Sequence, residues 1–275
     1  MKICFFNIRY VMIMSLFMSV GSNYAQQLIP WKQINEIKRE IKNLPCDREG
    51  ATANLDGPIE IEKWYDKNKR SHPSEYRILF LLKEAYGDDI KGLDIAELRR
   101  EETSLLCMDA GEGRPTYAPM VAIANMLVLN QTYTQVQRNS VVAYTVFKEC
   151  SAIVETKKEY GTSISSDSDI RINARRNKKL IEKQIAVYNP NVVILCGNNI
   201  FENIFITHDV LGHRAFGDLA NNTGKLRVNN KFSYYYNDHC IYINTYHPSS
   251  RVNKTDYCTE IVEAVRNWME ERDDE

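Results

Sequence analysis

The sequence lacks several features that would assign it to a specialised class of protein. Its formal net charge is only −1 over 275 residues, which argues against a protein that coats nucleic acid through charge alone. No apolar run reaches the ~20 residues that a transmembrane helix needs. There is no internal repeat and no low-complexity tract, which excludes solenoids and propellers. One globular domain is the most economical interpretation of this length.

Paired cysteine motifs are absent as well. The seven cysteines are widely scattered and contain no C-x-x-C pair, which argues against a zinc ribbon or an iron–sulfur cluster. Without Cys4 six would remain, and an oxidising compartment could pair them. Cys196, however, lies in an apolar run where a buried thiol is expected. The pattern favours free thiols in a reducing compartment, with no metal and no cofactor.

The first 25 residues differ in composition from the rest of the chain. They contain two basic residues, no acidic residue and an apolar run over residues 10–20, followed by small residues. This is the order of a signal peptide, although Asn23 stands where a cleavage site prefers a small residue. The alternative is a dispensable leader upstream of an internal start. We expect a leader or signal-like segment over 1–25 and one domain over 26–275, cytoplasmic unless the segment directs export, and without membrane contact once it is removed.

Apolar segments of strand length predict a buried sheet. Continuous apolar runs are typical of strands that are covered on both faces, and helical patterns separate them. We therefore expect an α/β fold, a three-layer α/β/α arrangement around a central, mainly parallel four-stranded sheet. The strand candidates are residues 77–83, 150–156 and 192–196, and residues 232–246 as two strands around a turn at Asn237-Asp238.

Helical periodicity predicts the other elements, and residues 46–75 are otherwise interpreted as loop. Ser166 and Asp169 open the strongest helix, where they can cap reciprocally, and Pro190 ends it. The remaining helix candidates are Trp31–Asn43, a short one around Glu60–Lys67, Pro115–Met126, Val136–Phe147 and a terminal helix with Tyr257, Ile261, Val265 and Trp268 on one face.

The ends of the expected strands carry residues suited to a site. Ligands of parallel α/β sheets bind where the strands end, at their carboxyl edge. Each residue there has a plain structural explanation, but their convergence on one edge favours function. They are Glu84 and Tyr86 after the first strand, Lys157 and Lys158 after the second, Asn198 after the third and His247 after the last.

Two of these strand ends resemble motifs of the uracil-DNA glycosylase superfamily. Lys83-Glu84-Ala85-Tyr86-Gly87 is similar to the first motif, where an aromatic residue or proline follows two positions after an acidic or amide residue. His247-Pro248-Ser249-Ser250-Arg251 is similar to the second motif, a His-Pro-Ser segment after the last strand. The strand led by Pro190 resembles the penultimate strand of the family. The resemblance covers about residues 75–270 and identifies residues 26–275 as a uracil-DNA glycosylase-like domain.

The resemblance implies a monomeric, metal-independent hydrolase that cleaves the N-glycosidic bond of a flipped uracil or other damaged base in single- or double-stranded DNA. Glu84 would hold or activate the water that attacks the sugar, and His247 would stabilise the leaving base. The residues implied in substrate binding are Tyr86 beside C5 of the base, Tyr117 as a stacking partner, Glu155 as a reader of the base edge, and Lys158, Asn198, Ser249 and Arg251 towards the DNA backbone.

Glu155 is a departure from the family, which usually has an asparagine at the end of its middle strand. A carboxylate only accepts hydrogen bonds, so uracil, with one donor beside an acceptor, should then be a poor substrate. A one-residue slip would instead point Glu155 to solvent. The chain also lacks the cysteines of the iron–sulfur members. The alternatives are a non-catalytic nucleic-acid or nucleotide-binding module of the same fold and an exported protein with an unrelated role.

Overall fold

The computed structural model describes residues 32–47, 49–69, 76–83, 94, 116–138, 140–159, 166–197, 200, 227–228, 233–236 and 239–273. The expected leader over residues 1–25 lies outside these ranges, so that expectation stays a prediction. Among the described helices, none is both long and apolar enough to cross a membrane.

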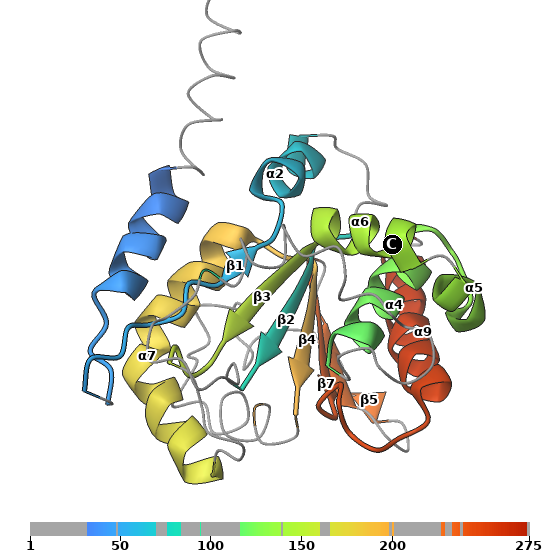
Figure 1. The fold of residues 1–275 in the computed structure, drawn as a ribbon. Coiled ribbons are helices and arrows are strands. Elements are labelled where there is room, and N and C mark those ends of the chain that lie inside the picture. The colour runs from blue at the N-terminus through green and yellow to red at the C-terminus, as the bar shows by residue number, and fades with distance from the viewer. Residues whose placement is uncertain are drawn as a thin grey trace, which may run out of the picture.

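The protein has an α/β fold in which helices flank a mixed, mostly parallel sheet (Figure 1). Its strand order is β1-β3-β2-β4-β7-β6-β5, with parallel pairing throughout the central four strands. The predicted strand count of four is too small, because antiparallel strands extend both edges. The strands are β1 (Gly57–Pro58), β2 (Ile78–Leu82), β3 (Ser151–Glu155), β4 (Val192–Cys196), β5 (Arg227–Val228), β6 (Ser233–Tyr236) and β7 (Ile241–Thr245).

Burial on both faces explains why the central strands are apolar without alternation. Every residue of β2, β3 and β4 is buried. Side chains alternate between two hydrophobic clusters, one on each face of the sheet. Phe80 belongs to one cluster, whereas Leu79 and Leu81 belong to the other.

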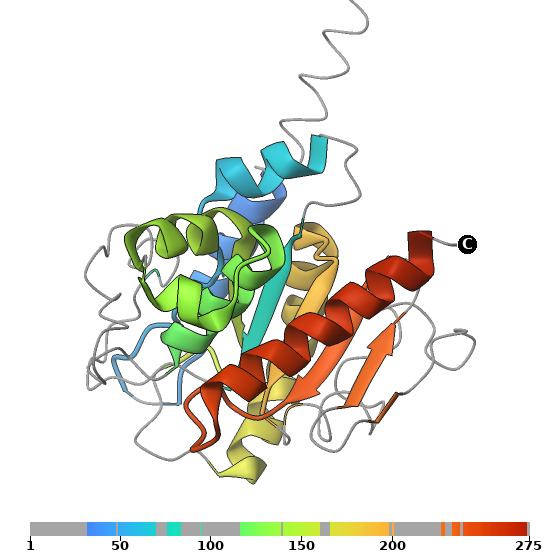
Figure 2. The same cartoon turned by 90° about the vertical axis from the view of Figure 1, so that its right-hand side faces the viewer.

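Helices cover both faces. Three helices pack on one face of the sheet: the helix over residues 32–42, α2 (Ile61–Lys69) and α7 (Asp167–Tyr188). The helix over residues 32–42 and α7 are seen on the left of Figure 1. On the other face α4 (Tyr117–Val128) and α9 (Lys254–Asp273) lie side by side, as Figure 2 shows, with α5 (Tyr133–Arg138) and α6 (Ser140–Cys150) next to α4. Most expected helices are confirmed within a few residues, including the terminal one with its buried stripe.

The expected single helix over Val136–Phe147 is wrong, because the chain forms the two helices α5 and α6 there. The first of these helices begins at a capping box formed by Thr132 and Gln135. Gln135 N–H donates to Thr132 Oγ1 at 3.3 Å, and Thr132 N–H donates to Gln135 Oε1 at 2.8 Å. This pair starts α5 at Tyr133, three residues before the expected start, and α6 begins separately at Ser140.

The boundaries of α7 follow from its ends. Ser166 Oγ accepts a hydrogen bond from Asp169 N–H at 3.2 Å, which confirms the predicted N-cap. At the other end Asn189 adopts a left-handed conformation with φ of 46° and donates to Ile185 O. Asparagine tolerates this conformation, and Pro190 after it prevents continuation of the helix.

The described cysteines are free thiols. Cys150, Cys196, Cys240 and Cys258 are buried, and Cys46 is half-buried. Burial raises the pKa of Cys240 to about 12 and raises the pKa of Cys196 further still. These thiols are protonated at neutral pH and poorly nucleophilic, in keeping with the expectation of free, buried cysteines.

Candidate functional site at the carboxyl edge

The four parallel strands end together at one edge of the sheet. Leu82 is in register with Glu155, and Cys196 is in register with Thr245. Figure 1 shows this edge at the bottom, together with the first turn of α4 and the chain between β7 and α9. The described residues that leave each strand are therefore neighbours, as the sequence predicted.

The loop over residues 246–253, which carries the His-Pro-Ser motif, is held by the first turns of α9. Lys254 Nζ donates to the carbonyl of Pro248 at 2.7 Å and to the carbonyl of Ser250. Tyr257 Oη donates to the carbonyl of the first loop residue at 2.9 Å. Because α9 packs in the core, these bonds fix the loop relative to the sheet.

His247 is held in one tautomer by its own loop. Its Nδ1 accepts a hydrogen bond from Ser249 N–H at 3.3 Å and lies 2.7 Å from Ser249 Oγ. An amide N–H only donates, so Nδ1 is the unprotonated nitrogen and Nε2 carries the proton of the neutral ring. Burial, and after it the positive charges of Lys83 and Lys254, lowers the pKa of His247 to about 4. At neutral pH the ring is uncharged and presents Nε2–H as a donor.

Glu155 is buried at the end of β3, with 1% of its surface exposed. The alternative that it faces solvent is therefore wrong. Its register partner Leu82 belongs to the cluster under α4 and α9, so alternation places the Glu155 side chain on that face. Tyr117, the first residue of α4, is half-buried against the same cluster. Both residues thus lie on one side of the carboxyl edge, where a base reader and a stacking partner would be needed.

Lys158 does not join this group. Its ammonium ion is buried and donates to Asp56 Oδ2 at 2.6 Å and to Gln184 Oε1 at 2.8 Å. Gln184 Nε2 donates to the other oxygen of Asp56, and Glu155 N–H donates to Oδ2 at 2.7 Å. The structure gives Lys158 a role inside the fold in place of the DNA backbone contact that was expected.

The remaining expected residues divide between the loop and the undescribed segments. Ser249 and Arg251 are exposed on the loop, beside Val252, an apolar side chain that is 36% exposed. Glu84, Tyr86 and Asn198 lie outside the described residues, so nothing in the structure places their side chains. Their described neighbours, Lys83 and Gly197, lie at this edge. Lys83 belongs to the first motif, which gave it no role, and Gly197 was not singled out from the sequence.

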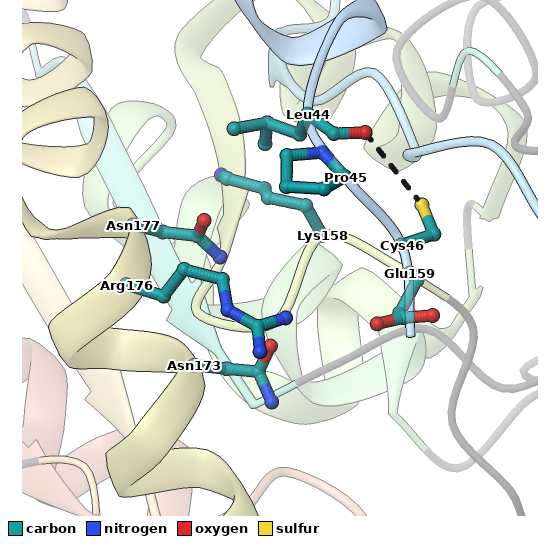
Figure 3. A pocket seen from close by; sticks show the side chains of 8 residues that line it. All are labelled: Leu44, Pro45, Cys46, Lys158, Glu159, Asn173, Arg176 and Asn177. Atoms are coloured by element: carbon teal, nitrogen blue, oxygen red, sulfur yellow. Dashed lines mark hydrogen bonds between the residues drawn. The ribbon is translucent and has the colours of Figure 1, made fainter. Parts of the chain in front are cut away.

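A shallow polar pocket lies elsewhere, against the flank of α7 (Figure 3). Its polar side chains are already engaged: Arg176 donates to Asp47 Oδ1 at 2.7 Å, and Asn177 Nδ2 donates to Thr156 O at 3.3 Å. The pocket contains none of the residues of the His247 loop. It is lined by Leu44, Pro45, Cys46, Lys158, Glu159, Asn173, Arg176 and Asn177.

A scan against protein-family models and a search of the curated proteins find no match for this chain.

Proposed function

We propose that this protein is a DNA base-excision hydrolase that cleaves the N-glycosidic bond of a flipped, modified base. The observation that carries the proposal is the neutral imidazole of His247, which presents Nε2–H at the carboxyl edge of a parallel sheet. Its position after the last strand, in a His-Pro-Ser segment, agrees with the resemblance to uracil-DNA glycosylases. The helices on both faces of the sheet agree with the α/β/α arrangement of that superfamily.

The proposed chemistry needs a hydrogen-bond donor that stabilises the departing base without transferring its proton to it. When the bond between C1′ and the base nitrogen breaks, its electron pair moves to the base and charge develops on a carbonyl oxygen. Nε2–H of His247 donates to that oxygen and stabilises the anion. Water adds to C1′, and Glu84, which follows Lys83 in the sequence, accepts the proton of the water.

The exposed loop residues suit contact with DNA. Ser249 and Arg251 can donate to phosphate oxygens, which positions a nucleotide without reading its sequence. A flipped base leaves a gap in the stack, and an apolar side chain is the group that fills such gaps. Val252 is the exposed apolar residue of this loop. We assign it this wedge role.

A non-catalytic module that binds a nucleotide is the second candidate. The buried Glu155 favours it, because a carboxylate in place of an amide is a poor reader of uracil. Such a module would bind a base at the same edge and leave the glycosidic bond intact.

A gel assay on single- and double-stranded oligonucleotides that carry uracil, 8-oxoguanine or 7-methylguanine tests the proposal. The wild type should produce abasic sites on at least one of them. Glu84→Gln and His247→Ala should each reduce turnover roughly a hundredfold or more and retain DNA binding. Asp256→Asn on the outer side of α9 is a matched control and should leave turnover unchanged. Binding without cleavage by the wild type would favour the second candidate.

A further inference from the structure

Lys83 leaves β2 with its backbone fixed at the carboxyl edge. Its carbonyl accepts a hydrogen bond from Lys157 N–H at 2.9 Å. One residue earlier, Leu82 O accepts both N–H and Oγ1–H of Thr156, at 2.9 and 3.0 Å. The ends of β2 and β3 are thereby tied together, so the Cα of Lys83 has a defined position from which its side chain starts.

The Lys83 side chain runs across the end of β4. A Cβ added at Gly197 would lie 3.2 Å from Lys83 Cε, closer than most real contacts. Gly197 also has φ of +139°, which side chains rarely adopt, and its N–H donates to Thr245 O at 2.9 Å. The absence of a side chain at Gly197 leaves the room that Lys83 occupies. The lysine thus extends from β2 over β4, in the direction of β7 and the loop that carries His247.

We propose that Lys83 is a further catalytic residue of this site, whose ammonium ion stabilises the negative charge on the departing base beside Nε2–H of His247. This inference rests on the proposed function. A second donor with a full positive charge suits a leaving group that becomes an anion, because charge-assisted hydrogen bonds are about twice as strong as neutral ones.

Lys83 and His247 act on the departing base, whereas Glu84 acts on the attacking water. As the C1′–N bond breaks, both electrons go to the base, and no proton is transferred to it in that step. Water then forms the new C1′–O bond and releases its proton to Glu84. Lys83 keeps its protons throughout and acts as a fixed charge. Its charge also opposes protonation of His247, whose pKa is lowered in part by Lys83. The ring therefore stays a neutral donor.

The test compares bases that leave as anions with one that does not. Uracil and 5-fluorouracil both leave as anions, and the fluorine makes the second a better leaving group. 7-Methylguanine carries a positive charge in DNA and leaves as a neutral base, whereas 8-oxoguanine leaves as an anion. Single-turnover rates are measured for wild type, Lys83→Met, Lys83→Gln and Lys83→Arg. Lys63→Met is the matched control, because Lys63 is an exposed lysine of α2 beyond the amino end of β3.

We expect the single-turnover rate on uracil or 8-oxoguanine to fall roughly tenfold to a thousandfold in Lys83→Met and in Lys83→Gln. The loss should be smaller on 5-fluorouracil and absent on 7-methylguanine. Lys83→Arg should retain most activity, and Lys63→Met should match the wild type. In an NMR titration the pKa of His247 should rise in Lys83→Met. Melting temperatures close to that of the wild type would show that the variants are folded.

Failure of the proposed function and failure of the role of Lys83 would give different results. A wild type that excises none of the four bases would overturn the proposed function, and this inference with it. The role of Lys83 alone would be overturned if the wild type is active and the single-turnover rates of Lys83→Met and Lys83→Gln fall equally on every base. Rates that do not fall at all in these variants would overturn it too. An unchanged His247 pKa in Lys83→Met would overturn it as well.

Discussion

Replacing Lys158 with methionine should destabilise the protein far more than an ordinary lysine substitution. Methionine keeps the length of the aliphatic chain and removes the ammonium ion that pairs with Asp56. The side chains of the pair are 3% and 0% exposed, so solvent cannot replace the lost partner. The Asp56 carboxylate would keep two donors, Glu155 N–H and Gln184 Nε2.

The magnitude follows from what remains buried. Removing one member of a buried ion pair costs about 3–5 kcal/mol, because an uncompensated charge stays inside. The two donors left on Asp56 favour the lower half of that range. Gln184 Oε1 also loses its bond from Lys158, which adds about 1 kcal/mol for an unsatisfied buried acceptor. Together these terms give an expected loss of about 4–5 kcal/mol, a large part of the roughly 5–15 kcal/mol that stabilises a typical domain.

Urea unfolding followed by circular dichroism measures this loss. Lys183→Met is the matched control: Lys183 lies on α7 next to Gln184 and pairs with Glu40 at the surface, where the side chains are 37% and 48% exposed. That variant should lose no more than about 0.5 kcal/mol. The double variant Asp56→Asn/Lys158→Met should lose less than the sum of the two single changes. A loss below about 1 kcal/mol for Lys158→Met, with an unchanged m-value, would refute the buried ion pair.

Two further predictions concern residues of the carboxyl edge. Because the pKa of His247 is about 4 in the folded protein and 6.5 for an unperturbed histidine, the unfolded chain takes up its proton first as the pH falls. This contribution to stability is complete above pH 6.5 and disappears between pH 6.5 and 4, by about 1–2 kcal/mol after allowance for partial exposure. His247→Gln should flatten that part of the curve measured by urea unfolding, and an identical pH dependence in both proteins would contradict it. Glu155→Asn should raise uracil excision at least roughly tenfold, because the amide can accept from N3–H and donate to O4. An unchanged rate on every base in the gel assay would remove Glu155 from base reading.

The sequence revealed the central strands because burial on both faces leaves a continuous apolar run. Antiparallel edge strands carry no such signal. β1 consists of Gly57 and Pro58, two residues typical of turns, and proline is tolerated there because the strand lies at the edge of the sheet. The start of α5 was accessible in principle through Thr132 and Gln135, whereas hydrophobic periodicity alone continues across the boundary between α5 and α6.

For the site, the predicted strand order placed His247 at the carboxyl edge of the sheet, and both His247 and Glu155 lie at that edge in the structure. The same reasoning fails for Lys158, because nothing in a Lys-Lys pair reveals a carboxylate about a hundred residues earlier that will bury one of them. The tautomer of His247 and the path of Lys83 were equally inaccessible, since both depend on side-chain contacts that the sequence does not display.

The hydrogen bonds from α9 to the His247 loop bear on how tightly a ligand can bind. A loop that must become ordered when its ligand arrives loses conformational entropy at that moment, which weakens binding by about 0.5–1.5 kcal/mol for each immobilised side chain. Lys254 and Tyr257 restrain this loop through three of its carbonyl groups, by hydrogen bonds that lie entirely within the fold. The entropy of the His247 segment is therefore lost during folding. Contacts made later by His247 contribute to affinity with little further ordering of the backbone.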